Sequence, residues 1–193
     1  MNRIFVITGK SSSGKDSIFR ELMKEKHDDL NRVIPYTTRP IREGECDGVE
    51  YRFSDETVFS RLKSEGKIIE DRSYDTVKGL WRYFTVDDGS FDGEKDVIMI
   101  GTLDTVISIR DYFGNRKETI PIYIECDDGE RLIRAVNREK KRTDPQYREL
   151  CRRFLADDED FSEEKLKKAG VQIRILNDDL LSCVREVRKH IWT

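Results

Sequence analysis

The stretch Gly9-Lys10-Ser11-Ser12-Ser13-Gly14-Lys15 determines how the rest of this sequence of 193 residues is interpreted. It matches the pattern GxxxxGK, in which backbone N–H groups and the start of the next helix hold nucleotide phosphates while the lysine neutralises their charge. The run from Ile4 to Thr8 is typical of a buried strand, and apolar residues recur at helical spacing from Ile18 to Met23. Because this is the context that the motif requires, all seven residues are predicted to bind ATP, and Lys15 is also predicted to act in catalysis.

The residue after Lys15 differs from the usual pattern. Most P-loops have Ser or Thr there, whose hydroxyl contacts Mg²⁺, whereas this chain has Asp16 followed by Ser17. A carboxylate also serves magnesium, directly or through water, so Asp16 is the candidate metal ligand and both residues join the predicted ATP site. The alternative is that Asp16 only caps the start of the helix. ATP and Mg²⁺ are therefore the expected cofactors.

Strand-like and helix-like segments alternate along the chain. Two later runs, 96–101 and 120–125, are almost continuously apolar, as expected of strands that helices cover on both faces. Helical patterns are present at 55–66, 105–113, 129–137, 147–159 and 179–191. This order predicts an α/β fold, with a mainly parallel central sheet flanked by helices and a P-loop at the end of its first strand.

Composition narrows the classes of partner. The sequence has 36 Lys and Arg against 39 Asp and Glu, a net charge of −3, which argues against a general binder of nucleic acid. We find neither a signal-peptide pattern nor an apolar stretch long enough to span a bilayer, so no membrane partner and a cytoplasmic location are expected. The four cysteines are widely spaced and are expected to be free thiols.

A second motif extends from Thr37 to Phe53 and reads TTRPIREGECDGVEYRF. With the P-loop upstream, it resembles the guanylate kinase family, and the resemblance covers almost the whole chain. It implies that Arg39, Arg42 and Tyr51 bind the phosphate of the acceptor, a task that suits planar guanidinium groups. The alternative for these arginines is a solvated, charged loop.

The resemblance continues along the predicted acceptor site. Glu70 matches the family glutamate that accepts hydrogen bonds from guanine, and Tyr83 and Thr85 match a tyrosine that contacts the acceptor phosphate and a hydroxyl that contacts the base. The alternative for Glu70 is a surface acid at the end of a strand. The family has a serine and an acidic pair at two further guanine contacts, where this chain has Pro35, and Ile100 with Thr102.

Three further arginines resemble the family residues that close over the phosphates, namely Arg134, Arg138 and Arg153. The resemblance implies a catalytic role for them, because such arginines stabilise charge on the transferred phosphoryl group. Their alternative is a solvated basic helix face. Asn177 matches a family segment beside the adenine and is a candidate ATP contact.

The resemblance implies one domain over residues 1–193 with a P-loop kinase fold. Its core is expected at about 1–35 and 89–193, an inserted acceptor-binding subdomain at about 36–88, and a lid at about 138–153. The implied activity is ATP-dependent phosphorylation of a nucleoside monophosphate, with GMP to GDP as the expected reaction, by a monomer or homodimer with nucleotide substrates as its small-molecule partners. Two alternatives stay open: a ribose 1,5-bisphosphate phosphokinase and a non-catalytic guanylate kinase-like binding module.

Overall fold

The computed structural model describes residues 2–24, 28–42, 44–76 and 79–192, so Glu43 of the arginine-containing motif lies outside the described residues. The chain divides into two compact units. The first unit comprises residues 1–4, 28–99 and 108–118, and the second comprises 5–27, 100–107 and 119–193. Within the described residues, none of the helices is both long and apolar enough to cross a membrane.

The larger sheet has five strands in the order β2-β7-β1-β8-β9. Its strands are β1 (Arg3–Thr8), β2 (Leu30–Arg32), β7 (Asp96–Ile100), β8 (Glu118–Glu125) and β9 (Ile173–Leu176). β2 pairs with β7 in parallel, and β8 pairs with β9 in parallel. The predicted α/β class with a mostly parallel central sheet is confirmed.

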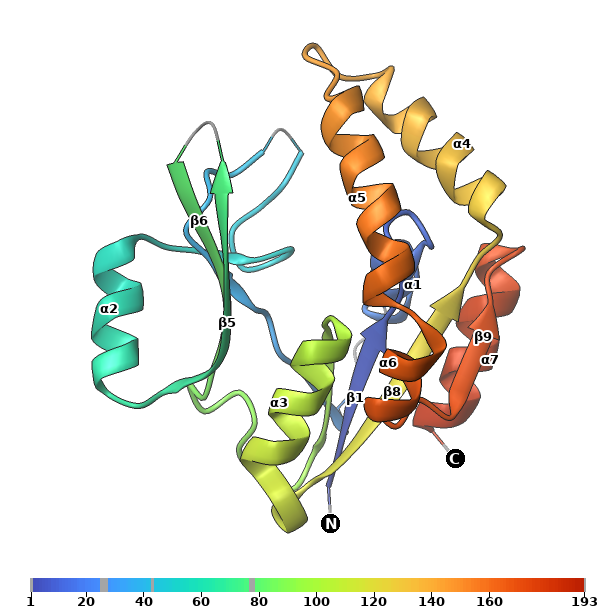
Figure 1. Cartoon of the computed structure of the whole chain (residues 1–193). Helices are drawn as coiled ribbons and strands as arrows, with labels where there is room; N and C mark the ends of the chain where they lie inside the picture. Colours follow the sequence, from blue (N-terminus) through green and yellow to red (C-terminus); the bar gives the residue numbers. More distant parts are fainter. Residues whose placement is uncertain (1, 25–27, 43, 77–78, 193) are drawn as a thin grey trace. The chain divides into compact units, whose positions relative to one another are not determined.

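The smaller sheet belongs to the first unit and has the strand order β4-β3-β6-β5. Its strands are β3 (Tyr36–Thr37), β4 (Arg52–Phe53), β5 (Ile68–Thr76) and β6 (Gly79–Val86). Helix α2 (Glu56–Ser64) lies along the hairpin of β5 and β6 (Figure 1). Asp55 caps α2 by accepting the N–H of Val58, and Phe59 and Leu62 pack on the sheet side chains Phe84 and Val86.

A one-residue bulge shifts the pairing of β5 with β6. Ile68 lies opposite Val86, but Glu70 lies opposite Thr85, so β5 has one more residue than β6 across this step. Directly opposed residues of an antiparallel pair point to the same face of a sheet. Glu70 therefore shares a face with Thr85, while Phe84 and Val86 point into the apolar cluster under α2.

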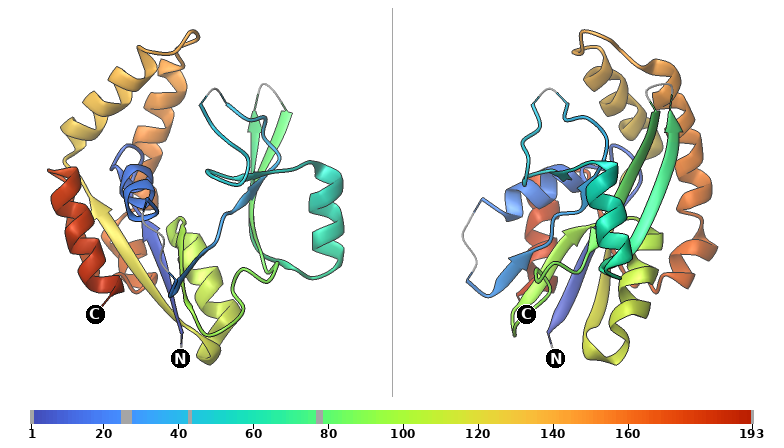
Figure 2. Two further views of the ribbon diagram at one scale, coloured as in Figure 1. Left: turned by 180° about the vertical axis from the view of Figure 1, so that it is seen from behind. Right: turned by 90° about the vertical axis from the view of Figure 1, so that its left-hand side faces the viewer.

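The second unit packs helices around the end of β1. Phe5, Val6 and Ile7 are fully buried, and α1 (Lys15–Leu22) packs against α7 (Leu180–Ile191). Helices α4 (Asp128–Glu139) and α5 (Tyr147–Asp160) form an antiparallel hairpin, seen in Figure 1 and from behind in Figure 2. The remaining helices are α3 (Leu103–Phe113), the 3₁₀ turn η1 (Gly114–Arg116) and α6 (Glu163–Lys168).

Candidate active site

The P-loop lies in the second unit, between β1 and α1. Gly14 has φ +97°, in the left-handed region that favours glycine, and a Cβ added there would lie 2.2 Å from Nδ2 of Asn177. A Cβ at Gly9 would lie 2.7 Å from the carbonyl oxygen of Ile124. Both glycines are therefore required by close approach of other atoms, as the motif predicts for a loop that wraps around phosphates.

Asn177 supports this loop. It follows β9, and its backbone N–H donates to the carbonyl oxygen of Glu125 at 2.8 Å. Its side chain is buried, and Nδ2 donates to the carbonyl oxygen of Ser13 at 2.7 Å. Sequence reasoning expected a contact beside the adenine, whereas the amide nitrogen is bound to the P-loop backbone. Its Oδ1 atom has no hydrogen-bond partner in the part of the chain that the structure describes.

Helix α1 starts at Lys15, with Gly14 as its N-cap residue. Asp16 therefore lies in the first turn of the helix and does not occupy the capping position, so the capping alternative is wrong. Its side chain is 72% exposed, and one carboxylate oxygen lies 3.7 Å from Nζ of Lys15. The positive end of the helix dipole also stabilises a carboxylate in the first turn.

The three candidate catalytic arginines lie on the hairpin of α4 and α5. Arg138 reaches the P-loop, since its Nη2 lies 3.4 Å from Oγ of Ser12, and Arg134 donates to the carbonyl oxygen of Asn177 at 3.2 Å. The structure thus brings the P-loop and two of the predicted arginines together within the second unit. Arg153 on α5 instead forms an ion pair with Glu149 of the same helix, at 3.5 Å.

The predicted acceptor residues lie in the first unit, where Arg39 is almost completely buried, with 3% of its side chain exposed. Its two Nη atoms each donate to one oxygen of Glu45 at 2.7 Å. The guanidinium also lies over the rings of Tyr51 and Phe53, at 5.0 and 5.3 Å from their centroids. Sequence reasoning missed Glu45, although it stands inside the same motif.

The charges of this pair shift both ionisation equilibria. Burial by itself would raise the pKa of Glu45, but hydrogen bonds from Arg39 and from the backbone N–H of Arg42 outweigh it and lower that pKa. Burial by itself would likewise lower the pKa of Arg39, and its hydrogen bonds to Glu45 outweigh it and raise that pKa. Tyr51 also packs edge-on against Tyr83, with ring centroids 5.6 Å apart. Three other predicted acceptor residues, Arg42, Tyr51 and Tyr83, thus lie around the ion pair of Arg39 and Glu45.

Glu70 is buried, which makes the alternative of an ordinary surface acid wrong. One carboxylate oxygen accepts the hydroxyl hydrogen of Thr85 at 2.9 Å, and the other accepts from Nε of Arg72 at 3.2 Å. This contact of Arg72 was not predicted from the sequence, although alternation along a strand places residues 70 and 72 on the same face. The structure brings Glu70 and Thr85 together as predicted.

Two of the departures from the family pattern have structural roles. The carbonyl oxygen of Pro35 accepts the N–H of Arg52, which helps to align β4. Thr102 precedes α3, and its hydroxyl accepts the N–H of Thr105 at 3.3 Å, as in a helix cap.

A family model described as guanylate kinase matches residues 1–193 of the chain. The chain belongs to the guanylate kinase family. Membership is supported by two curated guanylate kinases. The protein of Caldanaerobacter subterraneus is 30% identical over 186 residues, covering 96% of this chain and 84% of the relative, and that of Porphyromonas gingivalis is 27% identical over 198 residues, covering 99% and 97%. These identities are low, so this is a divergent member of the guanylate kinase family.

The fold agrees with this assignment. The crystal structure of guanylate kinase from Anaplasma phagocytophilum matches 100% of this chain and 87% of its own, with a TM-score of 0.69 at 19% identity. The P-loop, with its strand before and helix after, is thus present in a chain with the guanylate kinase fold.

Proposed function

We propose that this chain transfers the terminal phosphoryl group of ATP to GMP and so forms GDP and ADP. Membership of the guanylate kinase family over all 193 residues carries this proposal, because the P-loop that such an activity needs is intact in this chain. In the non-catalytic alternative the phosphate-binding loop has no task to perform, yet Gly14 and Lys15 are both present at the start of α1.

On the ATP side, the P-loop N–H groups and Lys15 would bind the β- and γ-phosphates. Arg138 already lies beside Ser12 of the loop, so it is placed to stabilise charge on the transferred group. The carboxylate of Asp16, which is exposed next to Lys15, is an oxygen ligand of the kind that Mg²⁺ prefers. Among the described residues no cluster of three or more His, Cys, Asp or Glu is arranged to hold a metal ion. When bound, Mg²⁺ offsets negative charge on those phosphates.

On the acceptor side, we assign phosphate binding to Arg39, Arg42 and Tyr51, with Tyr83 beside them. Glu70 and Thr85 would contact the base, because a carboxylate accepts hydrogen bonds from the N1–H and amino groups of guanine and adenine offers no such pair. The acceptor phosphate is already ionised at neutral pH, so the reaction needs no general base from the protein.

An ADP-release assay across acceptors tests the proposal. GMP, dGMP, AMP, UMP and ribose 1,5-bisphosphate are compared at equal concentration, and we expect GMP to have the highest kcat/KM. Lys15→Ala should lower this value roughly 100-fold or more with an unchanged melting temperature, because it removes a charge facing the phosphates and no core packing. ADP release that is fastest with ribose 1,5-bisphosphate, or unchanged in Lys15→Ala, would contradict the proposal.

A further inference from the structure

A fully buried arginine that has no role in the proposed reaction lies beside the P-loop. Arg131 on α4 has no exposed surface, although a buried guanidinium is costly unless all its donors are paired. Its Nε and Nη2 atoms donate to one oxygen of Asp128, at 2.9 and 2.6 Å. Its Nη1 atom donates at 3.0 Å to two acceptors, the carboxylate of Asp157 on α5 and the carbonyl oxygen of Ser11 in the P-loop. The guanidinium also lies 4.6 Å from the ring centroid of Phe154.

Asp157 completes the attachment to the same P-loop residue. It is 7% exposed, and its Oδ2 atom accepts the backbone N–H of Ser11 at 2.9 Å. Its Oδ1 atom lies 3.2 Å from the Ser11 hydroxyl. Arg131 and Asp157 therefore bind the carbonyl and the N–H of one residue, whose backbone is held from both sides. Backbone groups held by two charged side chains form strong hydrogen bonds, because each bond is charge-assisted.

The neighbouring P-loop residue is tied to the same helices. Nζ of Lys10 lies 2.7 Å from a carboxylate oxygen of Asp158 on α5 and 3.5 Å from one of Asp128 on α4. Both helices thus contact residues 10 and 11 at the start of the P-loop. The Arg131 guanidinium also lowers the pKa of Asp128, which keeps this carboxylate charged.

Helical spacing connects this attachment to the candidate catalytic arginines. Residues 131, 134 and 138 are separated by three and four positions, so they lie along one face of α4. Residues 153 and 157 lie one turn apart on α5 in the same way. Any movement of Arg131 relative to Ser11 would therefore carry Arg134 and Arg138 with it.

We propose that Arg131 and Asp157 are positioning residues, which hold Ser11 in register with α4 and α5 so that the P-loop and Arg138 meet the nucleotide phosphates together. This inference rests on the proposed use of the P-loop for ATP. A shift of about 1 Å in a catalytic group, caused by a change far from the reacting atoms, is enough to lower the rate roughly 100-fold. Loss of the attachment should therefore be visible in kinetics.

The test separates positioning from simple stabilisation. Removing one member of a buried ion pair leaves an unpaired charge, whereas replacing both by apolar residues often restores stability. Arg131→Met and Asp157→Leu are therefore made singly and together, and melting temperature, ATP dissociation constant and steady-state kinetics are measured. We expect the double variant to regain most of the melting temperature that the single variants lose. Its kcat/KM for ATP should stay reduced by about 10- to 100-fold, because the Ser11 backbone has lost both partners.

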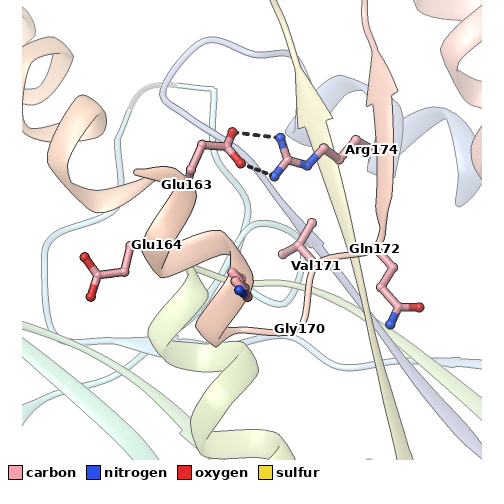
Figure 3. A pocket seen from close by; sticks show the side chains of 7 residues that line it. Glu163, Glu164, Gly170, Val171, Gln172 and Arg174 are labelled. Atoms are coloured by element: carbon pink, nitrogen blue, oxygen red, sulfur yellow. Dashed lines mark hydrogen bonds and ion pairs between the residues drawn. The ribbon is translucent and has the colours of Figure 1, made fainter.

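Arg174→Met is the matched control. Arg174 donates to both oxygens of Glu163 at 2.8 and 2.6 Å in the same unit, and the pair lines a shallow groove between α6 and β9 (Figure 3). Within the part of the chain that the structure describes, the hydrogen bonds and ion pairs of Arg174 and Glu163 do not involve the P-loop, so loss of the pair should leave ATP binding unchanged. Arg131→Lys provides a milder variant if the double variant fails to fold. A lysine keeps the charge but cannot bridge Asp157 and Ser11 as a fork, so we expect a folded protein with a weakened ATP affinity.

A double variant, or a folded Arg131→Lys variant, with wild-type ATP affinity and kcat would overturn the inference while leaving the proposed function in place. Because ATP binding is measured directly, the result also decides the inference if the acceptor is not GMP. Failure of the proposed function would appear instead as absent ADP release in the wild-type protein.

Discussion

Replacing Glu45 with glutamine removes the negative charge that pairs with the buried Arg39 guanidinium. The wild-type carboxylate accepts two hydrogen bonds from Arg39 at 2.7 Å and one from the backbone N–H of Arg42 at 2.9 Å. Breaking a buried ion pair costs about 3–5 kcal/mol. Since 18% of the Glu45 side chain is exposed and the amide still accepts one bond, we expect about 3 kcal/mol, near the lower limit. For a chain of this length that corresponds to a fall in melting temperature of about 6–12 °C.

The pH dependence gives this prediction its sharpest form. Because the pKa of Glu45 is lowered in the folded protein, its contribution to stability is complete above its ordinary value of 4.5 and is lost as pH falls through the folded pKa. Thermal unfolding is therefore followed at pH 7 and pH 3. The difference between wild type and Glu45→Gln should shrink at pH 3. Glu65→Gln, which removes the exposed pair of Glu65 with Lys67, is the control and should have no measurable effect. Equal effects of the two substitutions, or a pH-independent difference for Glu45→Gln, would refute the reasoning.

Two further predictions concern the base and the thiols. Glu70→Gln should lower the ratio of kcat/KM for GMP to that for AMP about tenfold or more, because an amide carries a donor where guanine needs an acceptor. A ratio that stays the same would remove Glu70 from base recognition. At pH 8, a thiol reagent should modify the exposed Cys46 quickly and Cys183 only after unfolding, since burial raises the pKa of the Cys183 thiol to about 11. Modification of each cysteine is followed by mass analysis of peptides, and rapid modification of Cys183 in the folded protein would contradict this prediction.

The sequence was most informative where a local pattern determines the structure. The apolar run at 96–101 is a strand, β7, and the helical pattern at 147–159 is helix α5, because burial on both faces or on one face leaves a distinct periodicity. β9 was missed because it has only four residues and three of them are exposed or half-buried.

The partners of the site residues were much harder to predict. Arg131 stands in a highly charged segment, where a pattern of hydrophobicity assigns arginine to the surface, yet it is fully buried. Its burial depends on Asp157, which is 26 residues away in the sequence and belongs to another helix. Such pairings follow from the packing of two helices and leave no local signal. The same holds for Asn177, whose contact with Ser13 spans 164 residues.

Because of the bulge between Ile68 and Glu70, the number of residues at this step, as well as their identity, decides which residue of β6 Glu70 faces. In an uninterrupted ladder, the residue two places after Ile68 would lie opposite Phe84, which points into the apolar cluster. Inserting one residue after Ile69, with the bulge kept, would likewise place the carboxylate opposite Phe84, turned toward that cluster and away from Thr85, with every site residue still present. Relatives with one residue more at this step would appear fully conserved in an alignment of site residues, yet they would present a different surface to the acceptor base.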